Sequence, residues 1–266
     1  MDINSFREEI WEQGRVLYRD MPWREDTEPY YVLVSELMLQ QTQVDRVIPK
    51  FDLFMNLFPG VGDLARAPLA DVLTTWSGLG YNRRAKYLHG AAKKIMTDFG
   101  GVIPDTHAEL TSLPGVGPNT AGAIRAYSFN QPAIFIETNV RTVYFHHFFE
   151  EEATVSDTAL REVVEKTIDT EHPREWYWAL MDYGSFLKRQ GVGRIAKSSH
   201  YKKQAPLKGS LREVRGLIIK ALAGRDYNDA DLRSLLPEDE RYMIAVAALI
   251  DEGLVTQAGN RLHLAR

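Results

Sequence analysis

LPGVGPNTA, residues 113–121, is the stretch of sequence that decides the fold. Its glycines, Gly115 and Gly117, permit tight turning of the backbone and close approach of another group. The helical pattern that follows, over residues 119–128, leaves unpaired backbone N–H groups just after the turn, and a helix start of this kind accepts an anion. The stretch therefore predicts a hairpin between two helices at which a phosphate can bind.

The sequence on both sides of this hairpin has the three- and four-residue spacing of apolar residues that is typical of helices. The segments with this spacing are Phe6, Ile10, Trp11 and Val16–Leu17, then residues 33–40, 44–57, 85–98 and 119–128. Glycine and proline separate them, so short loops join short helices. Residues 132–143 are rich in β-branched and aromatic residues and are interpreted as a buried extended segment that leads into a helix. The fold class expected is all-α.

A second pattern of helices and strands begins after residue 208, with Ser210 as a suitable N-cap for its first helix. The elements expected are helices over residues 211–223, 229–236 and 238–252 and strands over residues 254–257 and 261–264. Three helices and a terminal hairpin are typical of a winged-helix domain. Its third helix opens with Glu238-Asp239-Glu240, and this negative charge disfavours base reading in the major groove.

The composition excludes several kinds of site. The 266 residues include no cysteine, which rules out disulfides, thiolate zinc sites, cysteine nucleophiles and a cysteine-ligated iron–sulfur cluster in this chain. The net charge of −4 argues against a globally basic nucleic-acid binder, so any DNA affinity must come from local patches or backbone donors. The sequence has no signal-peptide pattern and no apolar run of about 18 residues, so we expect a cytoplasmic location without membrane contact.

Five motifs in the same order resemble one enzyme family. They are Pro22-Trp23, SELMLQQTQV at residues 35–44, WSGLGY at 76–81, LPGVGPNTA at 113–121 and IETNV at 136–140. Over about residues 5–190 the chain is similar to the MutY-like adenine glycosylases of the helix-hairpin-helix (HhH-GPD) DNA glycosylase superfamily. The resemblance implies a two-lobed helical enzyme that flips a damaged or mispaired base out of duplex DNA and hydrolyses its N-glycosidic bond.

This resemblance also predicts the domain organisation, with the winged helix as an addition at the C-terminal end. Residues 1–28 and 135–208 are expected to form one helical lobe, which includes a basic loop at 188–208. Residues 29–134 are expected to form a six-helix barrel that carries the hairpin at 113–121, and residues 209–266 the winged helix.

Base excision needs two carboxyl groups, one to protonate the leaving base and one to stabilise the oxocarbenium-like sugar. Glu36 matches the acid of the family, and its apolar neighbours are expected to raise its pKa. Glu137 takes the position of the family's catalytic aspartate and is one methylene longer, which changes the geometry. Asn139 matches the asparagine that orients this carboxylate, although it is also a suitable N-cap.

The resemblance assigns DNA contacts to three further groups of residues. Gln41 resembles the residue that wedges into the base stack, Thr42 the one that touches the orphan base, and Tyr81 the intercalating tyrosine. The hairpin residues expected at the DNA backbone are Gly115, Val116, Gly117, Asn119 and Thr120. Phe129 takes the place of a pocket tyrosine beside the leaving base, and Tyr127 is the residue that could replace it.

Asn119 also bears on the reaction type. Bifunctional relatives place a Schiff-base lysine at this position, and an amide cannot form that intermediate. We therefore expect a monofunctional glycosylase with little or no AP-lyase activity.

A basic stretch without acidic residues runs from Lys188 to Lys208. In the MutY-like relatives this part of the chain carries the four cysteine ligands of the cluster, and that loop presents cations to DNA. Such stretches are often solvated linkers, but here phosphate binding is expected for Arg194, Lys197, Lys202 and Lys203. No cofactor is expected except a sodium or potassium ion, which the resemblance implies at hairpin carbonyls near Gly115 and Gly117.

The leading hypothesis is a monomeric, nucleoid-associated enzyme of base excision repair that acts on double-stranded DNA. Adenine opposite 8-oxoguanine or guanine is the substrate expected first. The departures at Glu137 and Phe129 keep other bases open, namely uracil, mismatched thymine and hypoxanthine. Two alternatives outside catalysis also remain: a protein that only binds distorted DNA, and a winged-helix regulator with a decayed enzyme domain.

Overall fold

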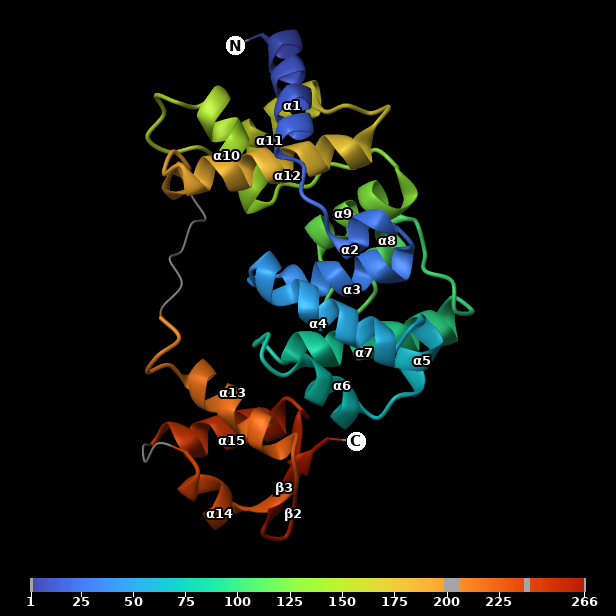
Figure 1. The fold of residues 1–266 in the computed structure, drawn as a ribbon, viewed down its shortest axis with the longest axis vertical. Coiled ribbons are helices and arrows are strands. Elements are labelled where there is room, and N and C mark those ends of the chain that lie inside the picture. Colours follow the sequence, from blue (N-terminus) through green and yellow to red (C-terminus); the bar gives the residue numbers. More distant parts are fainter. Residues whose placement is uncertain (1, 199–205, 237–239, 266) are drawn as a thin grey trace. The chain divides into compact units, whose positions relative to one another are not determined.

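The computed structural model describes residues 2–198, 206–236 and 240–265, which are predominantly helical, as the sequence predicts (Figure 1). The chain forms two compact units. The first comprises Met1–Val32, Asp105–Thr111 and Val116–Lys203, and the second Leu33–Pro104, Ser112–Gly115 and Gln204–Arg266. Among the described residues, none of the helices combines the length and the apolar character that a membrane span requires.

The first unit is built on its longest helix, α12. Its helices are α1 (Ile3–Leu17), α2 (Pro22–Glu25), α8 (His107–Thr111), α9 (Pro118–Phe129), α10 (Thr138–His147), α11 (Asp157–Thr167) and α12 (Pro173–Arg189). Helices α1 and α10 both pack against α12. The fully buried Phe6 of α1 joins the three helices, because its ring contacts Tyr144 of α10 and Trp176 of α12.

The second unit contains the remaining helices of the enzyme-like region. Helix α3 (Pro29–Leu39) enters it from the first unit, followed by α4 (Val44–Leu57), α5 (Val61–Arg66), α6 (Leu69–Trp76) and α7 (Arg83–Asp98). Helices α5 and α6 pack on α7, and Phe54 of α4 meets Trp76 of α6 in the core. The observed limits of α4 agree with the predicted 44–57, whereas α3 begins four residues before the predicted 33, at Pro29, a residue suited to the first turn.

The winged helix lies in the second unit as well. It consists of α13 (Leu211–Leu222), β1 (Tyr227–Asn228), α14 (Asp229–Ser234), α15 (Arg241–Asp251), β2 (Val255–Ala258) and β3 (Arg261–Leu264). The predicted hairpin is present, with Val255 opposite Leu264 and Ala258 opposite Arg261. Strand β1 adds to β3, giving the order β1-β3-β2, and a strand of two residues is too short for a period-2 pattern to predict. Ser210 caps α13 as predicted.

The expected barrel, residues 29–134, includes α8 and α9. In the structure both helices lie in the first unit instead, because α9 packs against α12. The ring of Tyr127 stacks with that of Trp178, and the Arg174 guanidinium donates to the Tyr127 and Ser128 carbonyls. These contacts bring the helix after the hairpin into the same unit as Glu137.

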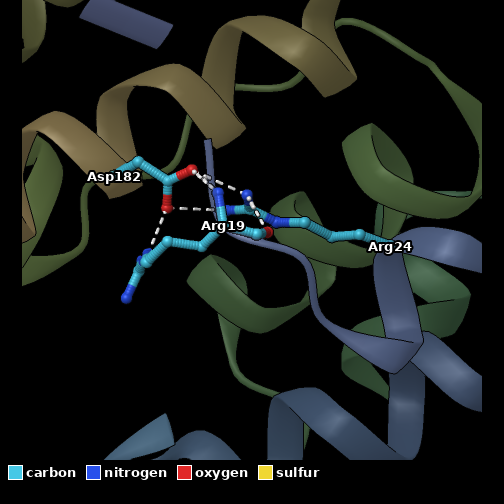
Figure 2. Close-up of polar contacts among 3 residues, drawn as sticks. All are labelled: Arg19, Arg24 and Asp182. Carbon is cyan, nitrogen blue, oxygen red and sulfur yellow. Dashed lines mark hydrogen bonds and ion pairs between the residues drawn. The ribbon is translucent and has the colours of Figure 1, made fainter. Parts of the chain in front are cut away.

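A buried ion cluster connects the segment after α1 to α12 (Figure 2). The Asp182 carboxylate, 1% exposed, accepts hydrogen bonds from Arg19 at 2.6 Å and from Arg24 at 2.7 Å. Arg24 also donates to the Arg19 carbonyl at 3.1 Å, and its guanidinium lies over the rings of Tyr18 and Trp178. One carboxylate thus holds two cations in the first unit.

We expect Asp182→Asn to destabilise the protein by about 3–5 kcal/mol, because it leaves the buried Arg24 guanidinium without a counter-charge at unchanged side-chain volume. Urea unfolding at neutral pH measures the loss. The control is Asp63→Asn, whose partner Arg66 is 71% exposed and for which the expected change is below about 1 kcal/mol. Equal losses in the two variants would show that the buried cluster contributes no more than a surface pair.

Candidate functional site

Two turns in the second unit have strained backbones. Gln41 and Tyr81 are non-glycine residues with φ of 55° and 49°. Left-handed backbone of this kind costs about 1–3 kcal/mol per residue and persists where the surroundings enforce it. Strain of this kind is concentrated at functional sites, and these are the residues for which the sequence predicts wedging into DNA.

A single buried side chain, Arg84 of α7, holds both turns. Its guanidinium donates to the carbonyls of Leu37 and Met38 at 2.7 and 2.8 Å, where α3 ends. It also donates to the Thr42 hydroxyl at 3.0 Å and to the Gly80 carbonyl at 3.1 Å. Arg84 thus replaces the missing helix partners at the end of α3 and connects the Gln41 turn with the Tyr81 turn.

The pKa of Arg84 is lowered to about 10, mainly by burial and to a lesser degree by the nearby Arg46, while Tyr81 opposes the shift. The group therefore remains charged at neutral pH. Its guanidinium lies 5.3 Å from the ring centroid of Trp76 and 5.4 Å from that of Tyr81, a cation–π distance in both cases. Arg84 is not among the site residues that the sequence predicts, and in the sequence only its position on an apolar helix face indicates burial.

The hairpin between α8 and α9 has one glycine that the chain itself requires. Gly115 has φ of +81°, and a Cβ there would lie 2.8 Å from the Tyr87 Cβ. Gly117, by contrast, has φ of −86°, and a Cβ there would meet no atom within 4 Å. The N-cap residue of α9 is Gly117, which has no side chain to accept from the N–H groups of the first turn. A helix start with glycine at the N-cap is an arrangement that suits an approaching phosphate.

Glu36 lies on α3 and is half-buried, directly before the fully buried Leu37 and Met38. It belongs to the second unit, whereas Glu137 belongs to the first. The apolar neighbours that the sequence predicts for Glu36 are therefore present.

Glu137 is the N-cap residue of α10, with extended backbone, but its side chain makes no capping hydrogen bond. The carboxyl is half-buried, and burial raises its pKa above the ordinary value. Among the residues that the structure describes, no cation pairs with it. A desolvated carboxyl at the positive end of a helix, without a capping role, is available for chemistry.

Asn139 lies two residues into α10 and binds a lysine. The Lys188 ammonium group, at the end of α12, donates to the Asn139 Oδ1 at 2.9 Å. The close approach of α12 depends on Gly184, because a Cβ there would lie 2.3 Å from the Asn139 carbonyl oxygen. Burial of the Lys188 amine, followed by the charge of Arg19, lowers the pKa of this lysine. The role of Asn139 in orienting Glu137 stays a prediction.

Asn119 contacts the backbone just before Glu137. Its Nδ2 donates to the Ile136 carbonyl and its Oδ1 accepts from the Ile136 N–H, both at 3.4 Å. The side chain thus mimics a strand neighbour and helps to position the segment that carries the carboxyl. The contact of Asn119 with the DNA backbone, which the sequence predicts, stays a prediction, and these long hydrogen bonds leave it open.

The two predicted pocket residues differ in burial. Tyr127 is 8% exposed, and its ring packs edge-on against Phe135, two residues before Glu137. Phe129, the last residue of α9, is half-buried. Of the two predicted pocket residues, Tyr127 is thus the one whose ring contacts the segment that leads to Glu137.

The basic loop is held to the end of α10. Arg194 donates to the Glu150 carbonyl and carboxylate at 2.8 and 2.6 Å, and Lys197 donates to the Phe149 carbonyl at 2.9 Å. Phosphate binding by these two residues would require an exchange of these contacts, and it stays a prediction. Lys202 and Lys203 lie outside the described residues.

The raised pKa of Glu137 predicts a pH-dependent stability. Folding favours the protonated carboxyl, so its stabilisation is complete below the unfolded pKa and is lost as the pH rises through the folded pKa. Glu137→Gln, which stays neutral, should therefore be more stable than the wild type at pH 7.5 and equal to it near pH 4. Urea unfolding at both pH values measures the difference.

Asp98→Asn is the control, for which the opposite change in stability at pH 7.5 is expected. Hydrogen bonds from Thr97 and then Lys94 lower the pKa of Asp98, so its stabilisation is present above the unfolded pKa and is lost on acidification. Its replacement should therefore cost stability at pH 7.5. A Glu137→Gln protein that is less stable than the wild type at pH 7.5 would show that the folded state favours the ionised carboxyl.

Known proteins resemble the chain in sequence and in fold. A family profile described as "HhH-GPD superfamily base excision DNA repair protein" matches residues 34–167. An adenine DNA glycosylase of Buchnera aphidicola subsp. Baizongia pistaciae is 34% identical over 173 residues, which are 64% of this chain and 48% of that protein. One of Mycobacterium tuberculosis is 44% identical over 127 residues, which are 47% of this chain and 42% of that protein.

The match therefore spans less than half the length of both curated relatives. The solved structure of a thermostable thymine-DNA glycosylase superposes with a TM-score of 0.60 at 25% identity, covering 68% of this chain and 87% of that one. The family profile covers half of the chain and includes Glu36, the hairpin and Glu137. The chain belongs to the HhH-GPD superfamily of base excision DNA repair proteins.

Proposed function

We propose that this protein is a monofunctional DNA glycosylase of base excision repair, with adenine opposite 8-oxoguanine or guanine as its first substrate. The observation that carries the proposal is the half-buried Glu137 carboxyl, which neither caps its helix nor pairs with a cation among the described residues. The relatives named adenine DNA glycosylases support the choice of base. We expect a monomer that acts on chromosomal DNA.

In the proposed reaction, Glu36 donates a proton to a ring nitrogen of the flipped base. The bond between C1′ and the base nitrogen then breaks, and its electron pair leaves with the base. The Glu137 carboxylate stabilises the positive charge that develops on the sugar. Water adds its oxygen to C1′, and the proton that it loses passes to the Glu36 carboxylate, which restores the starting protonation of both carboxyls.

The DNA contacts proposed here use the strained turns and the open hairpin. Gln41 and Tyr81, held by Arg84, would enter the base stack, and the uncapped start of α9 behind Gly117 would bind a phosphate. A sodium or potassium ion would be held by hairpin carbonyls near Gly115 and Gly117. The Gly115 carbonyl accepts a hydrogen bond from the Gln40 Nε2 at 3.3 Å, and a carbonyl oxygen has a second lone pair that such an ion could use. When bound, the ion would place positive charge beside the phosphate.

A panel of duplexes tests the function: A:8-oxoG, A:G, U:G, T:G, hypoxanthine and 5-hydroxyuracil, each followed by alkali to cleave abasic sites. We expect cleavage of the A:8-oxoG or A:G duplex, and Glu36→Gln and Glu137→Gln should each lower the single-turnover rate by at least about 100-fold. The matched control is Glu162→Gln, an exposed residue of α11, which should retain the wild-type rate.

Cleavage of a different duplex would assign one of the alternative bases. Glu137→Asp extends this test, because it restores the carboxylate length of the family. A rate increase of up to about 100-fold in this variant would show that the extra methylene misplaces the charge. Silence across the panel with tight duplex binding retained would contradict the catalytic proposal and favour a protein that binds distorted DNA.

Asn119 predicts the absence of a covalent intermediate. Borohydride reduction of the wild-type protein on its substrate should trap no protein–DNA complex, because an amide cannot form a Schiff base. Asn119→Lys is the positive control and should give a trapped band if this side chain reaches the sugar. Trapping by the wild type would mean that another amine attacks C1′, and Lys188, whose amine binds Asn139, would then be the first to replace.

A further inference from the structure

A network of ionic contacts docks the winged helix on α7. Glu252, at the end of α15, is at its centre: its carboxylate accepts two hydrogen bonds from Arg215 of α13 and lies 3.8 Å from the Arg83 Nε. The Glu252 carbonyl accepts from the Lys86 Nζ at 2.6 Å. Helix α13 and strand β3 also pack on α6. The domain is thus attached to the helix that follows the Tyr81 turn.

This docking brings Arg212 of α13 to Tyr81. The Arg212 guanidinium donates a hydrogen bond to the Tyr81 hydroxyl, and its Cζ lies 5.3 Å from the centroid of the ring. The Arg84 guanidinium lies 5.4 Å from the same centroid. Tyr81 is half-buried and has left-handed backbone, so a strained aromatic residue is held by two cations, one from α7 and one from the winged helix.

The two cations act on different parts of the tyrosine. Arg84 fixes the backbone of the turn through the Gly80 carbonyl, whereas Arg212 reaches the far end of the side chain through the hydroxyl. If the left-handed backbone at Tyr81 relaxed to another φ, the ring would move with it. The hydrogen bond at the Tyr81 hydroxyl opposes that movement.

We propose that the winged helix supports the DNA wedge and that Arg212 is a positioning residue, which holds the Tyr81 ring in the orientation that enters the base stack. The proposal rests on the proposed function, since it takes Tyr81 as a residue that separates stacked bases. It also gives a use to a winged helix whose eight basic and nine acidic residues leave no excess of positive charge for DNA. The domain would serve its own barrel rather than read a sequence.

The test uses a duplex with 2-aminopurine next to the mismatch, whose fluorescence rises when the neighbouring bases unstack. The full-length protein is compared with Arg212→Met, Tyr81→Phe and the double variant, at protein concentrations that saturate the duplex. Arg212→Met keeps the side-chain stem and removes the charge, and Tyr81→Phe keeps the ring and removes only the hydroxyl. Both the fluorescence change and the single-turnover rate are measured.

We expect each single variant to lower the excision rate roughly tenfold, with a smaller fluorescence rise, and the double variant to lose no more than either single one. Arg212→Lys should recover part of both signals. Arg233→Met, whose guanidinium lies 6.0 Å from the Tyr242 ring inside the winged helix, is the control and should behave as the wild type.

Two results would overturn the proposal. Losses that multiply in the double variant would show that Arg212 acts independently of the Tyr81 hydroxyl. A faster reaction or a larger fluorescence rise in Arg212→Met would show that the contact restrains the wedge instead of supporting it. If the wild type unstacks the duplex without excising any base, and Arg212→Met loses this unstacking, the positioning role stands and the glycosylase proposal fails.

Discussion

The buried guanidinium of Arg84 is the interaction on which the candidate DNA surface of the second unit depends. The last carbonyls of helix α3 lack N–H donors within the helix, and Arg84 donates hydrogen bonds to two of them, those of Leu37 and Met38. The same guanidinium also donates to Thr42 and Gly80. The guanidinium is planar, and its donors have fixed directions, so all four acceptors must keep their places at the same time. A lysine has no such fork and could not hold two turns in register.

Asp182 and Glu137, both in the first unit, have carboxylates with different surroundings. Asp182 lies between Arg19 and Arg24 and is neutralised by them, which makes it part of the framework. Glu137 has no such partner among the described residues, and its burial raises its pKa. The contrast separates a carboxylate that stabilises the fold from one whose environment disfavours its charge, and a carboxylate of the second kind can react with a developing cation.

The surroundings of Glu137 are shaped by close contacts between helices. Gly184 lets α12 approach the first turn of α10, and this approach brings Lys188 to Asn139. On the other side, Asn119 pairs with the backbone of Ile136. The residues on both sides of Glu137 are therefore held by side chains of α9 and α12. In the second unit, charged groups of the winged helix contact α7 and Tyr81 in a similar way.

The sequence by itself determined the helices, the hairpin, the winged helix and the exclusion of a cysteine-ligated cluster, because spacing, turn residues and composition are local properties of the chain. It also indicated Glu36 and Glu137 as the candidate carboxyls through their motifs. Only the tertiary structure decided that α9 joins the unit of α12, that Arg84 unites two turns, and that Arg212 reaches Tyr81. The Arg84–Thr42 contact spans 42 positions of the chain, and the Arg212–Tyr81 contact spans 131. No local pattern encodes a partner at such a separation.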